Sequence, residues 1–137
     1  YYMELETVMN YLACSIDLDG VRAEEIKKSL AMDIQEELTH ATTLGRRIKE
    51  LGGRIPGSSK FKYSQKYLQP PKDSTDVISV IKGVIEAEDS AIKHYNYLIK
   101  LVEGKDYVTQ DLIIRTLASE ERHKNEFEGF LKEYKKR

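Results

Sequence analysis

The chain has 137 residues and a formal net charge of −1 at pH 7. This length suits one domain, residues 1–137, with a sizeable hydrophobic core. The near-neutral charge excludes a general attraction to nucleic acid or to anionic lipid. The single cysteine, Cys14, excludes an internal disulfide and predicts a reducing, cytoplasmic location. No apolar run approaches the length of a membrane-spanning helix, so a membrane is not expected among the partners.

Four long helices are predicted, because apolar residues recur at helical spacing and no segment alternates with a period of two. Glycines follow the first three helices, at Gly20, Gly52 and Gly104, as is typical of helix C-termini. The helical pattern is already in progress at Tyr1, so the first helix is expected to begin upstream of this residue. In chain order, the predicted helices cover about residues 1–18, 23–51, 76–103 and 107–134.

The connections between these helices predict the topology. The first and third connections are short, so each joins an antiparallel helical hairpin. The middle connection, about residues 52–75, contains three prolines and is too long for a tight turn. It is long enough to run back along a helix of about 40 Å. The sequence therefore predicts an all-α four-helix bundle with one long crossover between the second and third helices.

A pattern of potential metal ligands occurs twice. Each hairpin has a glutamate on its first helix and a Glu-x-x-His on its second, at intervals of 33 and 32 positions. Residues three apart share one helix face, so each Glu-x-x-His can reach a single point. Counting from the turn of each hairpin places the glutamate of the first helix level with the Glu-x-x-His of the second. The six residues are Glu4, Glu37 and His40 in the first half and Glu88, Glu120 and His123 in the second.

The apolar stripes decide between a metal site and surface charges. Both Glu-x-x-His motifs and Glu88 fall inside the apolar stripes of their helices, where no lysine or arginine can compensate them. Buried carboxylates without a cation are costly, so two divalent metal ions are predicted to neutralise the four glutamates. A buried salt-bridge cluster is the alternative. Helical periodicity favours Glu4 over Glu6 as the ligand of the first helix. His94 lies outside the apolar face of the third helix, and it is therefore expected to be a surface histidine.

At Glu4, Tyr11, the two Glu-x-x-His motifs and Glu88, the sequence resembles the ferritin-like superfamily, above all the bacterioferritins and their short Dps-like relatives. The segment from 106 to 123 is similar to the fourth helix of bacterioferritins. The resemblance implies a di-iron ferroxidase centre that oxidises Fe(II) with O₂ or peroxide, for iron storage or detoxification. It further implies a homo-oligomer, with Glu37 and Glu120 bridging the metal ions. Tyr11 would be a catalytic neighbour that donates a hydrogen bond or an electron.

The chain also departs from these families. Leu38 stands where bacterioferritins have their haem-ligand methionine, so no haem is expected. One cysteine cannot form the cysteine-rich iron site of rubrerythrins or the cysteine pair of archaeal Dps-like relatives. DNA binding is not expected either, because the basic residues near the C-terminus form only a short cluster. Its members are Lys132, Lys135, Lys136 and Arg137.

Two other functions fit the same ligand set. The first is a di-iron or di-manganese oxidase or peroxide reductase acting on another substrate, since both metals accept nitrogen and oxygen ligands. The second is a non-catalytic bundle in which the metal ions only stabilise the fold. Neither composition nor spacing distinguishes iron from manganese.

Overall fold

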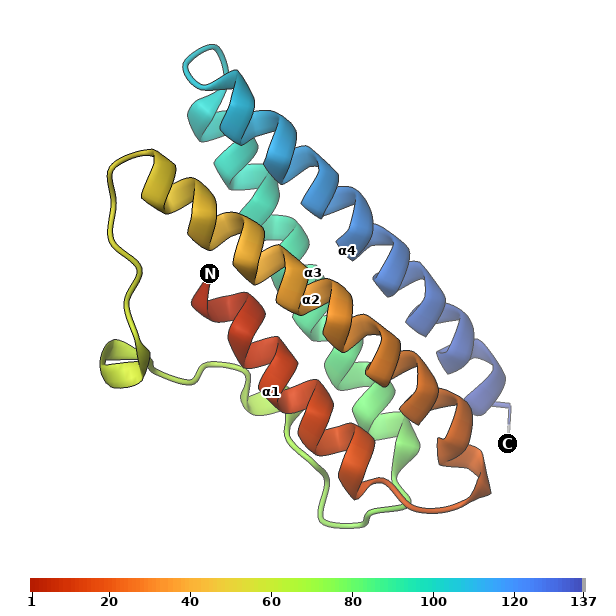
Figure 1. Ribbon diagram of the computed structural model, residues 1–137. Coiled ribbons are helices and arrows are strands. Elements are labelled where there is room, and N and C mark those ends of the chain that lie inside the picture. The colour runs from red at the N-terminus through yellow and green to blue at the C-terminus, as the bar shows by residue number, and fades with distance from the viewer. Residues whose placement is uncertain (137) are drawn as a thin grey trace. The chain divides into compact units, whose positions relative to one another are not determined.

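The computed structural model of the protein describes residues 1–136, so Arg137 of the basic cluster lies outside the described residues. Four α-helices follow one another, and residues 1–136 contain no strand (Figure 1). The all-α prediction is confirmed, and the predicted helix ranges agree closely with the observed ones. The helices are α1 (Tyr2–Asp17), α2 (Glu24–Glu50), α3 (Val77–Val102) and α4 (Tyr107–Tyr134). Short 3₁₀ turns lie at Val21–Ala23, Ser58–Lys60 and Lys66–Leu68.

The chain divides into two compact units, of which the first is Tyr1–Val77 and the second begins at Ile78. The first unit is the antiparallel hairpin of α1 and α2 together with the long connection that follows α2 (Figure 1). The second unit is the antiparallel hairpin of α3 and α4. Both predicted hairpins are therefore present. No helix among residues 1–136 is long and apolar enough to span a membrane.

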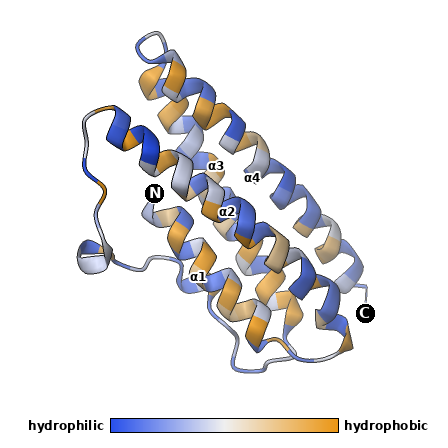
Figure 2. Ribbon diagram, in the orientation of Figure 1, coloured by the Kyte–Doolittle hydropathy of each residue, from blue (hydrophilic) through white to orange (hydrophobic). Residues whose placement is uncertain are grey.

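Each helix buries the apolar stripe that its sequence predicts, and Figure 2 shows hydrophobic residues recurring between hydrophilic ones along every helix. Most of the hydrophobic residues with little or no exposed surface lie on these helices or at their ends. In the first unit they include Tyr11, Cys14, Leu18, Ile26, Leu30 and Ala41. In the second unit they include Val80, Ile81, Val84, Ala91, Tyr95, Ile113 and Phe127.

The turn between α3 and α4 is compact because neighbouring residues supply the hydrogen bonds of the backbone groups at both helix ends. Gly104 has a φ of 72°, a left-handed conformation that glycine adopts without strain. The amides of Lys105 and Asp106 donate to the carbonyl of Val102, at 2.9 and 3.0 Å, and thereby complete the end of α3. The Asp106 carboxylate then accepts from the backbone amide of Thr109 at 3.1 Å and caps α4.

The long connection after α2 runs beside α1 from one end of that helix to the other. Near the start of α1, the Tyr2 ring meets Phe61 edge-on at 5.5 Å between ring centroids. Beyond the end of α1, the Asp19 amide donates to the Ser74 carbonyl at 2.8 Å. The connection therefore carries the chain back along the hairpin, as the sequence predicts for a long crossover.

Buried polar contacts fix the crossover halfway along α1. The Glu6 carboxylate accepts hydrogen bonds from the backbone amides of Ser64 and Gln65, both at 2.8 Å, and from the Ser64 hydroxyl at 3.0 Å. The Gln65 side chain donates to the Thr7 hydroxyl at 2.8 Å and accepts from the Asn10 amide at 3.0 Å. Glu6 therefore anchors the crossover, which explains why this glutamate is buried although it lies off the face that carries Glu4.

Cys14 has no exposed surface, and burial, reinforced by the nearby negative charge of Asp17, raises the pKa of its thiol to about 11. Only about one thiol in a thousand is then ionised at pH 8, and the thiolate is the reactive form. We expect native protein to react with a disulfide reagent such as DTNB at least about 100-fold more slowly than protein unfolded in guanidinium. Equal rates in the two states would contradict the buried position of this thiol.

Candidate metal centre

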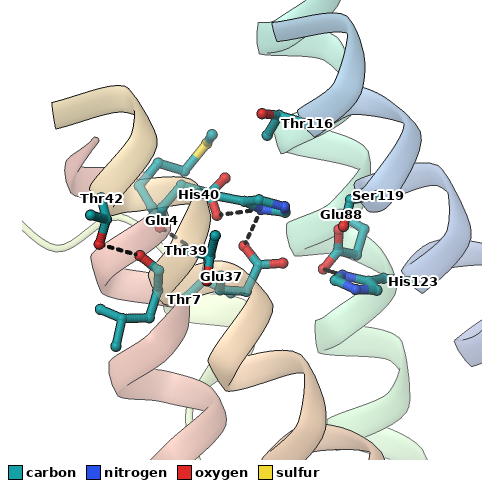
Figure 3. A network of polar contacts seen from close by, with 12 residues as sticks. Glu4, Thr7, Glu37, Thr39, His40, Thr42, Glu88, Thr116, Ser119 and His123 are labelled. Atoms are coloured by element: carbon teal, nitrogen blue, oxygen red, sulfur yellow. Dashed lines mark hydrogen bonds and ion pairs between the residues drawn. The ribbon is translucent and has the colours of Figure 1, made fainter. Parts of the chain in front are cut away.

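The first predicted triad lies within the hairpin of α1 and α2. Glu4 comes from α1, and Glu37 and His40 come from successive turns of α2. His40 Nδ1 is 3.4 Å from Glu4 Oε2 and 3.6 Å from Glu37 Oε2 (Figure 3). Both glutamates are 1% exposed, and one ligand atom of each residue lies within 4.8 Å of those of the other two. The three residues can therefore share one cation.

The second triad repeats this arrangement within the hairpin of α3 and α4. Glu88 comes from α3, and Glu120 and His123 come from α4. His123 Nδ1 is 3.8 Å from Glu88 Oε1 (Figure 3), and one ligand atom of each of the three residues lies within 4.8 Å of the other two. All three side chains are buried.

The hairpin register explains why residues distant in sequence meet in each unit. In both hairpins the glutamate of the first helix lies beside the Glu-x-x-His of the second, at the level that counting from the turn predicts. Within each Glu-x-x-His, the glutamate and the histidine point the same way because positions three apart share a helix face. The structure thus brings each predicted triad together, and the role of its members as metal ligands remains a prediction.

The chemistry of each donor set fits a divalent cation with a preference for oxygen and imidazole nitrogen. Two carboxylates and a neutral imidazole carry a charge of −2, which one divalent ion neutralises. The charge of these sets favours a bound cation, because residues 1–136 bury six carboxylates and no lysine or arginine. A buried carboxylate without compensation is strongly unfavourable. Iron and manganese both suit such a set.

Asp33 was not among the predicted site residues, but it is buried on α2 with 5% of its surface exposed. Asp33 precedes Glu37 by four positions and therefore lies on the same face of the helix. That spacing is visible in the sequence, but of the polar residues only Glu37 and His40 were predicted to lie in the buried face of this helix. The buried acidic face of α2 is thus one turn longer than predicted.

Two further predicted positions can be placed. Tyr11 has no exposed surface and lies on α1, seven positions after Glu4 and on the same face. Leu38, which replaces the methionine of a haem site in the resemblance described above, has 44% of its surface exposed. The catalytic role of Tyr11 and the absence of haem both remain predictions.

Comparisons with known proteins agree on one family. A model of the ferritin-like domain matches residues 2–137. The "DNA protection during starvation protein" of Pyrococcus furiosus is 29% identical over 133 residues, which covers 93% of this chain and 70% of that protein. The bacterioferritin of Desulfovibrio desulfuricans is 27% identical over 128 residues, covering 93% of this chain and 67% of that one.

A solved structure shows the same fold. It is that of a dodecameric thioferritin, the bacterioferritin-related protein from Bacteroides fragilis, which matches with a TM-score of 0.87 at 23% identity. The match covers 98% of this chain and 81% of that protein, so the predicted ferritin-like four-helix bundle is confirmed. Because the family model spans almost every residue, this chain belongs to the ferritin-like family.

Proposed function

We propose that the two triads together bind two iron ions and that this protein oxidises Fe(II) with O₂ or peroxide, for iron storage or detoxification. The observation that carries the proposal is the duplicated, buried set of two carboxylates and one imidazole, one set in each hairpin. The repeat in the sequence and membership of the ferritin-like family support joining the two sets into one dinuclear centre.

The donor types suit both oxidation states of the substrate. Imidazole nitrogen accepts Fe(II), whereas carboxylate oxygens favour the harder Fe(III), so oxidation strengthens binding to the glutamates. Each Fe(II) loses one electron, and a pair of ions therefore delivers two electrons to one oxidant. With two protons, these reduce O₂ to hydrogen peroxide, or reduce peroxide to two molecules of water. By the family resemblance, Glu37 and Glu120 would hold both ions, and the other four residues would each hold one.

The similar proteins suggest how the activity is used. The thioferritin is dodecameric by its title, and we propose that this chain also forms a homo-oligomer. The Pyrococcus furiosus relative is named for DNA protection. A net charge of −1 gives no general attraction to DNA, so any protection here is proposed to come from removal of Fe(II) and oxidant.

The test is an anaerobic titration of metal-stripped protein with Fe(II), followed by addition of O₂ or hydrogen peroxide. We expect two Fe(II) to bind per chain and to be oxidised rapidly, with an Fe(III) absorbance band and measurable oxidant uptake. A parallel titration with Mn(II) distinguishes the metals. Stoichiometric binding of Fe(II) without oxidation would instead indicate a structural metal site, and lack of binding would reject the proposal.

A further inference from the structure

One side chain of the crossover holds α1 at two points. The Gln65 side-chain amide donates to the Thr7 hydroxyl at 2.8 Å, and its carbonyl oxygen accepts from the Asn10 side-chain amide at 3.0 Å. All three side chains are buried. Thr7 and Asn10 are three positions apart and share one face of α1, so a single side chain reaches both. Gln65 therefore restricts both the rotation of α1 about its axis and its sliding along that axis.

The contacts of Thr7 continue to the turn of α1 that carries Glu4. The Thr7 hydroxyl accepts from Gln65 and donates its own proton to the Met3 carbonyl at 3.0 Å (Figure 3). Met3 is bonded to Glu4, whose Oε2 lies 3.4 Å from His40 Nδ1. A continuous series of hydrogen bonds and covalent bonds thus leads from the crossover to the first triad.

Directional contacts of this kind suit the placement of a metal ligand. The core that α1 shares with α2 is apolar, and apolar attraction has no preferred direction. Hydrogen bonds weaken steeply when their angle or length departs from the optimum. A ligand of a metal ion must be held to within about 0.5 Å of its working position. The polar contacts of the crossover are therefore better suited than apolar packing to fix the position of Glu4.

We propose that Gln65 is a positioning residue for the first triad: through Thr7, it sets the place at which the Glu4 carboxylate meets His40. This role rests on the function proposed above, because it requires the triad to hold a metal ion. Gln65 acts through α1 and is itself neither a ligand nor a catalytic residue. The second triad, whose members belong to α3 and α4, provides an internal reference for a site-selective effect.

The experiment breaks the series at Thr7. Thr7→Val removes the hydroxyl and keeps the shape of the side chain, whereas Thr7→Ser keeps the hydroxyl. Each change is made in two backgrounds: Glu120→Gln, which is expected to retain the ion of the first triad, and His40→Ala, which is expected to retain that of the second. Metal-stripped protein is titrated anaerobically with Co(II), which binds nitrogen and oxygen ligands with an affinity between those of Fe(II) and Ni(II).

We expect Thr7→Val to weaken Co(II) binding at the first triad by about 10- to 100-fold, as is usual when a partner that orients a metal ligand is lost. Binding at the second triad should not change, and Thr7→Ser should behave as the unchanged residue does in both backgrounds. Gln65→Ala breaks the same series at its other end and should reproduce the selective loss. Lys66→Ala is its matched control, because Lys66 is the next residue and its side chain is exposed.

Unchanged affinity at the first triad in Thr7→Val or Gln65→Ala would overturn the proposal, and so would an equal loss at both triads. A loss in Thr7→Ser as large as that in Thr7→Val would also count against it, because the hydroxyl would not be the cause. Either break suffices for the test if the other variant does not fold.

The outcomes also separate this proposal from the proposed function. Wild-type protein that binds neither Fe(II) nor Co(II) overturns the metal centre itself. Fe(II) that binds without being oxidised overturns the ferroxidase function and leaves the role of Gln65 intact. Two bound ions in wild type, with no selective loss in the variants, overturn only the role of Gln65.

Discussion

Glu120→Gln is expected to lower the Fe(II) stoichiometry from two ions to one per chain, and to slow Fe(II) oxidation by more than about 100-fold. Loss of a partner that only orients a metal ligand already costs about 10- to 100-fold in affinity or activity, and Glu120 is proposed as a ligand itself. Its side chain is 1% exposed and lies within 4.8 Å of the ligand atoms of Glu88 and His123. Anaerobic calorimetry gives the stoichiometry, and stopped-flow absorbance gives the rate.

The same substitution is expected to stabilise the metal-free protein, by about 1 kcal/mol in the free energy of unfolding. It replaces a buried carboxylate with a neutral amide of the same shape, and removing a charge from water is unfavourable. Bound metal favours the wild-type protein, because an ion that binds only the folded state stabilises that state and wild type is expected to bind more metal. Wild-type protein should therefore gain more thermal stability from metal than the variant does.

Glu121→Gln is the matched control, because Glu121 is the next residue of α4 and its side chain is exposed. This change removes the same charge from the surface and should leave stoichiometry, rate and stability nearly unchanged. Full ferroxidase activity in Glu120→Gln would remove the basis for the dinuclear centre. A loss of activity together with a lower unfolding temperature of the metal-free protein would indicate misfolding rather than loss of a ligand.

The helices and the two triads were predictable because their signals are local. Apolar spacing marks the buried face of each helix, and a glycine such as Gly104 marks an end. A short turn then fixes the register of a hairpin, so that counting from the turn pairs Glu88 with Glu120.

The environment of the crossover was not predictable, because its partners are distant in sequence. Glu6 meets Ser64 and Gln65 across 58 and 59 positions, and no periodic signal relates a loop residue to one position of a helix. Two glutamates two residues apart on α1 therefore looked like competing ligands. In the structure they face different partners: Glu4 lies beside His40, and Glu6 holds the crossover.

Because Glu6 holds the crossover, Glu6→Ala is expected to destabilise the protein without removing a metal ligand. The change deletes the acceptor of three hydrogen bonds at 2.8 to 3.0 Å, one of them from the buried Gln65 amide. Hydrogen bonds to charged groups contribute about 1.5 to 3 kcal/mol each, and water can replace only those from the exposed Ser64. We expect a loss of about 3 kcal/mol and a fall of roughly 10 °C in Tm.

Limited proteolysis locates the effect. Cleavage of Glu6→Ala should begin in residues 51–76, because the crossover loses its attachment to the middle of α1 and its backbone opens to solvent. Glu25→Ala is the control, since Glu25 makes only an exposed ion pair with Lys28 at 3.3 Å and should change Tm little.

Anaerobic Fe(II) titration then separates the neighbouring glutamates. Glu6→Ala should still bind two ions and Glu4→Ala should not, whereas the reverse result would make Glu6 the ligand and Glu4 a structural residue.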